Sequence, residues 1–295
     1  MKGRVYMIFK GSGVALITPF DEEGNVNFKK LKELLKFHIK KNTDAVVVCG
    51  TSGEAATLSD DELKEIIKFS VENVNKKIPV IAGTGSNNTR HCIELSKYAE
   101  SVGADGLLIV TPYYNKCTQE GLYLHFKEIA NSVTLPIIIY NVPTRTCVNI
   151  EPETVVRLSK ISNVVGIKEA SGNISQIAKL LSIAPKEFAV YSGNDDETLP
   201  IMSLGGAGVI SVIANIYPKE MHDLCKYFFE GNIEKSRKIQ FKYLDLMKKL
   251  FIEVNPMPIK ESMNILGKKV GECRLPLCKM SNSNIEILKK SLKEL

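Results

Sequence analysis

Eight short apolar segments recur along the chain at intervals of 21 to 35 residues, and this regularity limits the folds open to it. Each segment holds three to five residues, many of them β-branched, with Gly, Pro, Asp or Asn near its borders. They cover residues 14–17, 45–48, 80–82, 107–110, 137–140, 164–167, 188–191 and 209–213. Short, uniformly apolar segments are typical of parallel strands, because both faces of such a sheet are covered. We therefore predict eight buried parallel strands.

The residues between these segments carry helical patterns. Apolar side chains recur at a spacing of three to four residues over 28–41, and Ser59 and Glu62 form a capping box that opens a second helix. Pro152 stands at the first position of a further helix, between two glutamates. Strands that alternate with helices in this way predict an α/β protein, a (β/α)8 TIM barrel. A doubly wound sheet is the alternative, but no GxGxxG motif follows the first segment.

The strand pattern ends near residue 218. Beyond it the sequence predicts three or four helices, because Gly and Pro interrupt an otherwise amphipathic pattern. The breaks fall at Gly231, at Asn255-Pro256 and over residues 267–276. We expect a barrel over residues 8–218 and a C-terminal helical segment over 219–295 that packs on it.

Two further segments need an interpretation. Residues 198–218 carry no charge, but they include two Pro and three Gly, so we predict a buried helix–strand unit rather than a membrane span. We expect Met1–Tyr6 to be an extension, because Met7 is a second plausible start. No apolar segment with a cleavage site occurs in the first 20 residues, so we expect no signal peptide.

Composition excludes several classes of protein. Of the 295 residues, 44% are hydrophobic and 24% charged, which is typical of a folded soluble protein and not of a disordered, collagen-like or coiled-coil chain. The net charge of +6 arises after residue 218, where lysines alternate with apolar residues. That pattern favours solvated helix faces over a nucleic-acid site, and we expect no nucleic-acid or membrane partner. Seven cysteines without a CxxC pair favour reduced thiols in a cytoplasmic protein.

Polar side chains follow the predicted strands at their carboxyl ends, where TIM barrels carry their active sites. They include Thr18, residues 50–54, 83–85, 111–115, 140–141, 168–169, 192–194 and Asn215. These positions hold no histidine and no cluster of carboxylates. We therefore expect no metal and no cofactor.

Lys168 is the most informative of these residues, because it ends an apolar strand. Burial would lower the pKa of its amine, and a neutral amine adds to a ketone or aldehyde to form a Schiff base. The alternatives are an ion pair with Glu169 or a lysine that extends to the rim. Adjacent strand residues point to opposite sides, which disfavours the ion pair.

Four other residues complete a candidate site. Tyr140 ends the preceding strand, so its phenol can transfer a proton beside Lys168, and Thr51 could link it to a second phenol, Tyr114. The alternative for Tyr140 is a core aromatic residue. Arg145 follows on a loop, where it either grips a carboxylate or forms a surface salt bridge.

The Ser52 turn and a glycine-rich segment also need an interpretation. The hydroxyls and backbone N–H groups of the turn around Ser52 can hold a carboxylate, unless it is an ordinary connection. Gly205–Gly208 resembles a phosphate loop weakly, and we interpret it as close helix–strand packing.

Four motifs together carry a resemblance to a known family. They are Gly50-Thr-Ser-Gly-Glu54, Thr111-Pro-Tyr-Tyr-Asn115, Tyr140-Asn-Val-Pro-Thr-Arg145 and Gly166-Ile-Lys-Glu-Ala170. Their order and spacing resemble the pyruvate-dependent class I aldolases of the N-acetylneuraminate lyase superfamily, over about Phe9 to Leu266. The resemblance is strongest to members that condense pyruvate with aspartate 4-semialdehyde, on the diaminopimelate route to lysine.

The resemblance implies a role for each candidate residue. Lys168 would bind pyruvate as a Schiff base and Tyr140 would donate and accept protons. Thr51 and Tyr114 would complete a proton relay, with Tyr114 reaching in from a neighbouring subunit of a homotetramer, a dimer of dimers. The substrate-binding residues implied are Ser52 for the pyruvate carboxylate, Arg145 for the semialdehyde carboxylate, and Gly193 and Ile210 for backbone contacts.

Two departures from the family pattern concern Ser52 and a regulatory site. Ser52 replaces a threonine but keeps the hydroxyl, so we expect little loss. Members that lysine inhibits place a carboxylate where this chain has His91, and histidines where it has Asp60 and Leu63. Because a bound lysine would lose its counter-charge, we expect weak or no inhibition by lysine.

Two rival functions stay open. One is a different acceptor, as in N-acetylneuraminate lyase or a sugar-acid aldolase, but Arg145 favours an acceptor with a carboxylate. The other is a homologue that binds a keto acid or a partner without turnover, since barrels host many functions.

Overall fold

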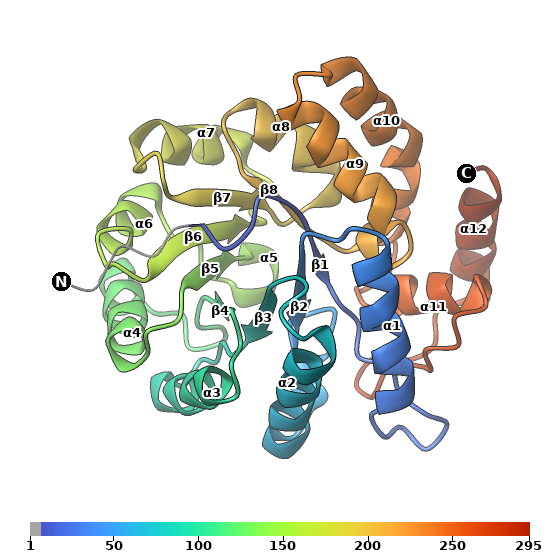
Figure 1. Ribbon diagram of the computed structural model, residues 1–295, viewed down its shortest axis with the longest axis horizontal. Helices are drawn as coiled ribbons and strands as arrows, with labels where there is room; N and C mark the ends of the chain where they lie inside the picture. Colours follow the sequence, from blue (N-terminus) through green and yellow to red (C-terminus); the bar gives the residue numbers. More distant parts are fainter. Residues whose placement is uncertain (1–6) are drawn as a thin grey trace.

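Eight parallel strands close into a barrel in the computed structural model, which describes residues 7–295 (Figure 1). Each strand pairs with its neighbour in chain order, and β8 pairs with β1. The strands are β1 Gly11–Ala15, β2 Ala45–Val48, β3 Val80–Gly83, β4 Gly106–Val110, β5 Ile137–Asn141, β6 Val164–Glu169, β7 Ala189–Ser192 and β8 Gly208–Ser211. The predicted TIM barrel is confirmed, and the doubly wound alternative is wrong. The predicted extension Met1–Tyr6 lies outside the described residues.

The first and last strands differ from their predicted bounds. β1 begins at Gly11, three residues before the apolar segment, because glycine and serine are buried there against β2 and β8. A Cβ atom at Gly13 would lie 2.9 Å from the ring of Phe9, so a small residue is needed where that ring enters the barrel. At the other end, residues 212–213 lie beyond β8, which ends at Ser211.

Helices surround the barrel on its outside (Figure 1). They are α1 Phe28–Lys40, α2 Asp60–Val74, α3 Thr89–Ser101, α4 Gln119–Ser132, α5 Pro143–Thr146, α6 Pro152–Leu158, α7 Ile174–Ile183, α8 Thr198–Ser203, α9 Pro218–Phe229, α10 Ile233–Lys249, α11 Met257–Ile265 and α12 Asn282–Lys293. The capping box of α2 is confirmed: Ser59 Oγ accepts from the Glu62 N–H, and Glu62 Oε2 accepts from the Ser59 N–H. Pro152 begins α6, as predicted.

The apolar core has two parts. The larger part lies between the strands and the surrounding helices. The smaller part fills the barrel interior, where the rings of Phe9 and Tyr191 stack with centroids 4.4 Å apart. Because Phe9 precedes β1, this stack lies toward the amino ends of the strands and leaves the carboxyl ends free for a cavity.

The chain after β8 forms four helices, α9 to α12, with breaks at the predicted places. α9 contacts β1, and α10 packs against α9 and α12. The segment after α11 lies beside α1, with Lys268 Nζ 3.7 Å from the centroid of the Phe37 ring. The division of the chain at residue 218 stays a prediction.

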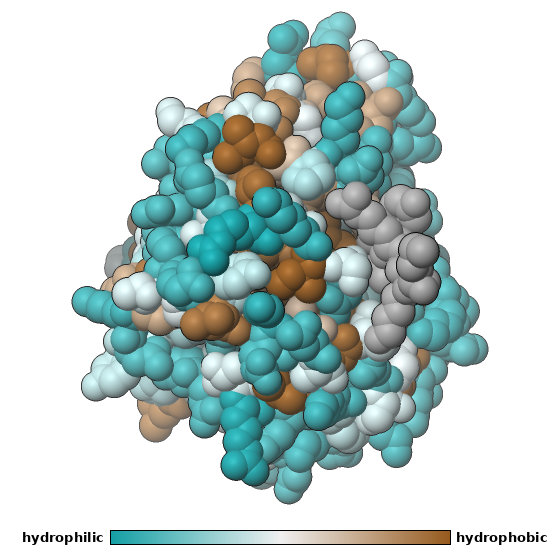
Figure 2. Space-filling view, turned by 90° about the vertical axis from the view of Figure 1, so that its left-hand side faces the viewer, coloured by the Kyte–Doolittle hydropathy of each residue, from teal (hydrophilic) through white to brown (hydrophobic). Residues whose placement is uncertain are grey.

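The uncharged stretch 198–218 folds as the predicted buried unit, with α8 followed by β8 and a 3-10 turn over Ile213–Asn215. Within residues 7–295 no helix combines the length and apolar character that crossing a membrane requires. The face turned to the viewer in Figure 2 is mostly hydrophilic, with apolar side chains in small separate groups.

Candidate active site

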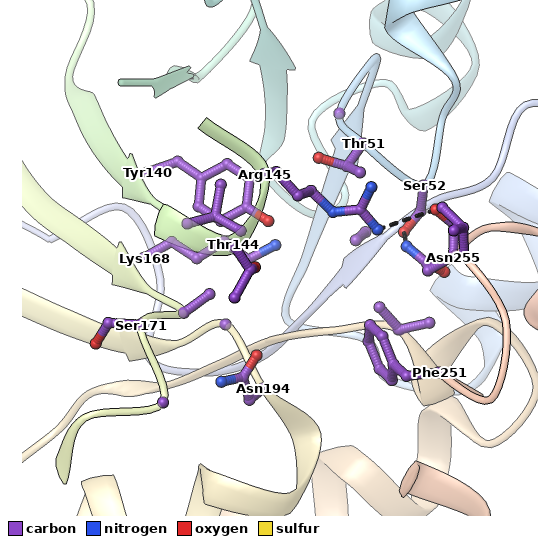
Figure 3. Close-up of a pocket in the computed structure, with 18 of the residues that line it drawn as sticks. Thr51, Ser52, Tyr140, Thr144, Arg145, Lys168, Ser171, Asn194, Phe251 and Asn255 are labelled. Carbon is purple, nitrogen blue, oxygen red and sulfur yellow. Dashed lines mark hydrogen bonds between the residues drawn. The ribbon is translucent and has the colours of Figure 1, made fainter. Parts of the chain in front are cut away.

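A cavity of about 590 Å³ opens at the carboxyl ends of the strands. Its walls come from β1, β2, β4, β5 and β6, from the loops that follow β2, β5, β6, β7 and β8, and from residues 251–255 between α10 and α11 (Figure 3). Six of the predicted site residues line it: Thr51, Ser52, Tyr140, Arg145, Lys168 and Gly193. The structure therefore brings together residues that are up to 142 positions apart in sequence.

Lys168 and Tyr140 are direct neighbours in this cavity. They are register partners on β6 and β5, and Lys168 Nζ lies 4.3 Å from the centroid of the Tyr140 ring. Lys168 is only 4% exposed, yet its amine makes no ion pair or hydrogen bond with any residue from 7 to 295. A buried amine without a counter-ion beside an open cavity is available to react with a substrate carbonyl.

Glu169, the next residue, points away from the cavity. Its carboxylate accepts hydrogen bonds from Asn141 Nδ2, at 3.0 and 3.1 Å, and from the Ser171 N–H at 2.9 Å. Burial raises the pKa of this carboxyl. The alternation of side chains along a strand thus separates the two residues, and the ion-pair interpretation of Lys168 is wrong.

Gly193 gives the lysine its space. A Cβ atom there would lie 2.6 Å from Ala170 Cβ and 3.2 Å from Lys168 Cε. Any larger residue would therefore press on the lysine side chain. The Gly193 N–H donates to the Glu169 carbonyl at 2.7 Å, which fixes the loop after β7 against β6.

The turn after β2 presents Thr51 and Ser52 to the cavity. Thr18 Oγ1 donates to the Gly53 carbonyl at 2.7 Å, and Ser52 Oγ accepts from Asn255 Nδ2 at 3.0 Å. The Thr51 hydroxyl has no hydrogen-bond partner in the described part of the chain. The hydroxyl chain through Thr51 stays a prediction.

Arg145 lies on α5, at the rim of the same cavity. Its Nη2 donates to the Asn255 carbonyl at 3.0 Å. No carboxylate pairs with it among residues 7–295, so the surface salt bridge is wrong for this residue. Its other N–H groups are free to bind an anion in the cavity (Figure 3).

Tyr114 and Ile210 are not part of the cavity wall. Tyr114 is 89% exposed on the loop after β4, with φ at 72°. Ile210 is buried in the barrel interior on β8. The role of Tyr114 in a neighbouring subunit stays a prediction, as do the backbone contacts of Ile210.

The glycine-rich segment before β8 serves packing. A Cβ atom at Gly208, where φ is 138°, would lie 1.9 Å from the Gly11 carbonyl oxygen. Gly208 thus allows β8 to approach β1 at this point, which agrees with the packing interpretation of Gly205–Gly208.

Sequence reasoning missed the part of the wall that comes from the C-terminal segment. Phe251, Val254 and Asn255 line the cavity, and Asn255 contacts both Ser52 and Arg145. The sequence indicated only a helix break at Asn255-Pro256, because no local pattern shows which distant turn a loop contacts. In the described part of the chain, no group of three or more His, Cys, Asp or Glu side chains is arranged to hold a metal.

Comparison with known proteins gives one consistent result. The model of the dihydrodipicolinate synthetase family matches residues 8–295. A protein of Acetivibrio thermocellus named 4-hydroxy-tetrahydrodipicolinate synthase is 58% identical over 287 residues, 97% of each chain. One of the same name from Clostridium novyi is 56% identical over 285 residues, 97% of this chain and 96% of its own.

Solved structures agree with this result. The crystal structure of dihydrodipicolinate synthase from Aquifex aeolicus has a TM-score of 0.95 and 47% identity, over 97% of this chain and 98% of that one. A structure described as the first monomeric dihydrodipicolinate synthase variant also has a TM-score of 0.95, with 45% identity over 97% of each chain.

Proposed function

Because this chain belongs to the dihydrodipicolinate synthetase family, we propose that it condenses pyruvate with aspartate 4-semialdehyde to give 4-hydroxy-tetrahydrodipicolinate. It is then a lyase of the diaminopimelate route to lysine. The observation that carries the proposal is the buried, unpaired amine of Lys168 against the Tyr140 ring, in a cavity with Arg145 at its rim.

The proposed reaction begins at Lys168. Its amine adds to C2 of pyruvate, water leaves, and an imine forms. Loss of a proton from C3 gives the enamine, whose C3 then attacks the aldehyde carbon while the new alkoxide takes up a proton. The amino group of the semialdehyde next attacks C2, closes the ring and displaces the lysine amine. No cofactor is needed, because the imine itself accepts the electrons of the broken C–H bond.

Proton transfers in this sequence are assigned to Tyr140. Its phenol belongs to the residue that pairs with Lys168 in the β5–β6 register, which suits transfer at C2 and at the alkoxide. Thr51, which lines the same cavity, would connect Tyr140 to Tyr114 of a neighbouring subunit. The free hydroxyl of Thr51 and the 89% exposure of Tyr114 support this assignment.

The two carboxylates of the substrates are assigned to two different residues of the wall, Ser52 and Arg145. Ser52 would hold the pyruvate carboxylate through its hydroxyl and N–H, near the Lys168 amine. Arg145 would hold the semialdehyde carboxylate, because its remaining N–H groups are unpaired at the rim. Backbone groups of Gly193 and Ile210 would complete the pyruvate subsite.

We further propose a homotetramer, a dimer of dimers, in the cytoplasm. Support for assembly comes from Tyr113 and Tyr114, large side chains that are exposed on one loop. One of the similar structures is described as a monomeric variant, so the oligomeric state does not follow from the fold. Sedimentation of the purified protein tests it. The seven free cysteines support a reducing compartment.

The test is pyruvate consumption by the purified protein with two alternative acceptors. Turnover with aspartate 4-semialdehyde and not with N-acetylmannosamine is the expected result. Turnover with the sugar alone would agree with a Schiff base on Lys168 but would show that aspartate 4-semialdehyde is not the acceptor. Silence with both would favour a homologue without turnover. Borohydride reduction in the presence of pyruvate should attach the substrate to Lys168, which peptide mass spectrometry detects.

A further inference from the structure

A second lysine is buried as deeply as Lys168, and no step of the proposed reaction uses it. Lys260 lies on α11, and its Nζ is 2.8 Å from Glu54 Oε1 and 2.7 Å from the Glu272 carbonyl. The side chains of Lys260 and Glu54 are 2% and 1% exposed. Burying two charges is costly, and apolar residues of similar size often stabilise a fold as well or better. The position of this ion pair therefore needs an explanation.

Glu54 belongs to the turn that carries Thr51 and Ser52. Its backbone adopts a left-handed conformation, with φ at 55°. Its second carboxylate oxygen, Oε2, accepts from the Arg274 N–H at 2.9 Å. Both oxygens of Glu54 are thus bonded to the C-terminal segment, one to α11 and the other to the irregular segment between α11 and α12.

The neighbours of Glu54 in the turn are held as well. Ser52 Oγ accepts from Asn255, and the Gly53 carbonyl accepts from Thr18. Three consecutive residues of the turn are therefore fixed by groups from elsewhere in the chain. Two of these three attachments come from the C-terminal segment.

Arg274, in the C-terminal segment, also binds residues that follow the turn. Its guanidinium donates to the Thr57 carbonyl at 2.9 Å and to both oxygens of Glu62, at 2.8 and 2.5 Å. The first residues of α2 are thereby joined to the stretch that contacts Glu54. The connection between β2 and α2 is held at both of its ends.

We propose that the Glu54–Lys260 ion pair is a positioning element of the active site, which holds the turn after β2 so that Thr51 and Ser52 face Lys168. The proposal rests on the proposed function, because it assigns the ion pair to the pyruvate subsite of that reaction. Glu54 and Lys260 are positioning residues that act through Ser52 and Thr51. Loss of the Lys260 amine leaves the Glu54 carboxyl without its ionic bond to α11, so the turn loses that attachment whether the carboxyl takes up a proton or moves toward water.

The experiment compares Lys260→Met with wild type at a temperature at which circular dichroism shows both to be fully folded. With saturating aspartate 4-semialdehyde, we expect the KM for pyruvate to rise about tenfold, because a displacement of an ångström in a binding group has effects of this order or larger. We expect kcat to fall less. Glu54→Gln keeps an oxygen for the Arg274 N–H, so its KM should lie between the other two.

Asp44→Asn is the matched control. Asp44 pairs with His222 at the amino end of β2, at 3.0 Å, on the opposite end of the barrel from the cavity. Its loss should lower stability without changing the KM for pyruvate. An unchanged KM in Lys260→Met, or an equal rise in Asp44→Asn, would overturn the proposal.

Failure of the proposed function has a different signature from failure of this inference. If wild type turns over neither acceptor, the proposed function is wrong, and the positioning proposal is then tested by the pyruvate concentration that gives half-maximal borohydride trapping on Lys168. A rise of that concentration in Lys260→Met supports positioning, and an unchanged value overturns it. If Lys260→Met does not fold, the same two measurements are made on Glu54→Gln.

Discussion

Lys168 and Lys260 are both removed from water, at 4% and 1% exposure, but their surroundings differ in kind. The Lys260 amine has a carboxylate, a carbonyl and the face of the Phe20 ring, whose centroid is 4.2 Å away. The Lys168 amine has the Tyr140 ring and an open cavity. An ammonium group has three donors, so the protein nearly satisfies the hydrogen-bonding capacity of Lys260 but not that of Lys168. Burial alone therefore does not mark a reactive lysine; the lack of partners does.

The two sites also differ in how they balance charge. Burial lowers the pKa of Lys260, while the nearby Glu54 carboxylate opposes that shift. No carboxylate is paired with Lys168 within residues 7–295: the Tyr140 ring lies beside its amine, and the buried Asp195 carboxylate interacts with it without an ion pair. The cavity beside the Lys168 amine can admit a substrate, whereas Lys260 does not line that cavity.

Replacing each lysine by methionine should separate the two roles, and Lys168→Met has the larger effect. Without the amine no imine forms, so kcat/KM should fall by at least about 10⁴-fold. Thermal unfolding should be unchanged or should shift upward, because the Lys168 amine makes no hydrogen bond or ion pair with residues 7–295 that the variant would lose. Steady-state kinetics with calorimetry on the same preparation tests both parts. Turnover near that of wild type would exclude Lys168 as the nucleophile.

Lys260→Met should show the reverse pattern. Breaking a buried ion pair by removing one partner costs about 3–5 kcal/mol, because the other charge stays buried. The free energy of unfolding from urea titration should fall by about this amount, while borohydride at high pyruvate still traps the substrate on Lys168. The double variant Glu54→Gln with Lys260→Met should recover part of the loss. A double variant no more stable than Lys260→Met would show that charge burial is not the cause.

The sequence alone identifies Lys168 as a functional residue but not Lys260, and the reasons show what a sequence can and cannot predict. Lys168 was found because it ends an apolar strand, and eight such strands at regular spacing predict a barrel whose carboxyl ends hold the site. Tyr140 followed from the same argument, since neighbouring strands end together. Local periodicity therefore predicts the fold and the part of the cavity wall that stands at the ends of the strands, including Lys168 and Tyr140.

Lys260 and Asn255 could not be found in this way. Lys260 stands in a helix among lysine-rich helices, where a lysine is usually solvated, and its partner Glu54 is 206 residues away. Asn255 contacts Ser52 across a similar separation. Nothing in a helix break or an amphipathic pattern specifies such contacts, because they depend on how the C-terminal helices pack on the barrel.

The Asp44–His222 pair joins a carboxylate to a basic side chain, as the Glu54–Lys260 pair does, but it lies nearer to solvent. Both side chains are about one-fifth exposed, and the hydrogen bond with Asp44 raises the pKa of His222. His222 therefore binds its proton more tightly in the folded chain than in the unfolded one. Its contribution is fully present below the unfolded pKa of about 6.5 and is lost as pH rises through the folded value.

The expected size is about 1 kcal/mol, because water competes at this depth. The free energy of unfolding of wild type should exceed that of His222→Gln by about this amount at pH 6, and the difference should shrink by pH 9. His125 is the contrasting control, because burial lowers its pKa to about 4. The contribution of His125 to the free energy of unfolding should grow with pH up to about pH 6.5 and stay constant above it. If replacement of His222 and replacement of His125 change the free energy of unfolding with the same dependence on pH, His222 is not the titrating group.

Free lysine is a third amine to set beside Lys168 and Lys260, and here the expected effect is smallest. His91 stands where lysine-inhibited members of the family have a carboxylate, and its Nε2 lies 3.0 Å from Asp60. The Asp60 carboxylate already has a partner, so a bound lysine would find no unpaired carboxylate there to play the part that Glu54 plays for Lys260. Initial rates at subsaturating pyruvate should therefore be unchanged by lysine up to the millimolar range. Asp60→Asn should behave in the same way, because Asp60 is paired with His91 and is not expected to bind lysine. Inhibition at sub-millimolar lysine would contradict this reasoning, and relief of that inhibition in Asp60→Asn would identify the carboxylate that the lysine uses.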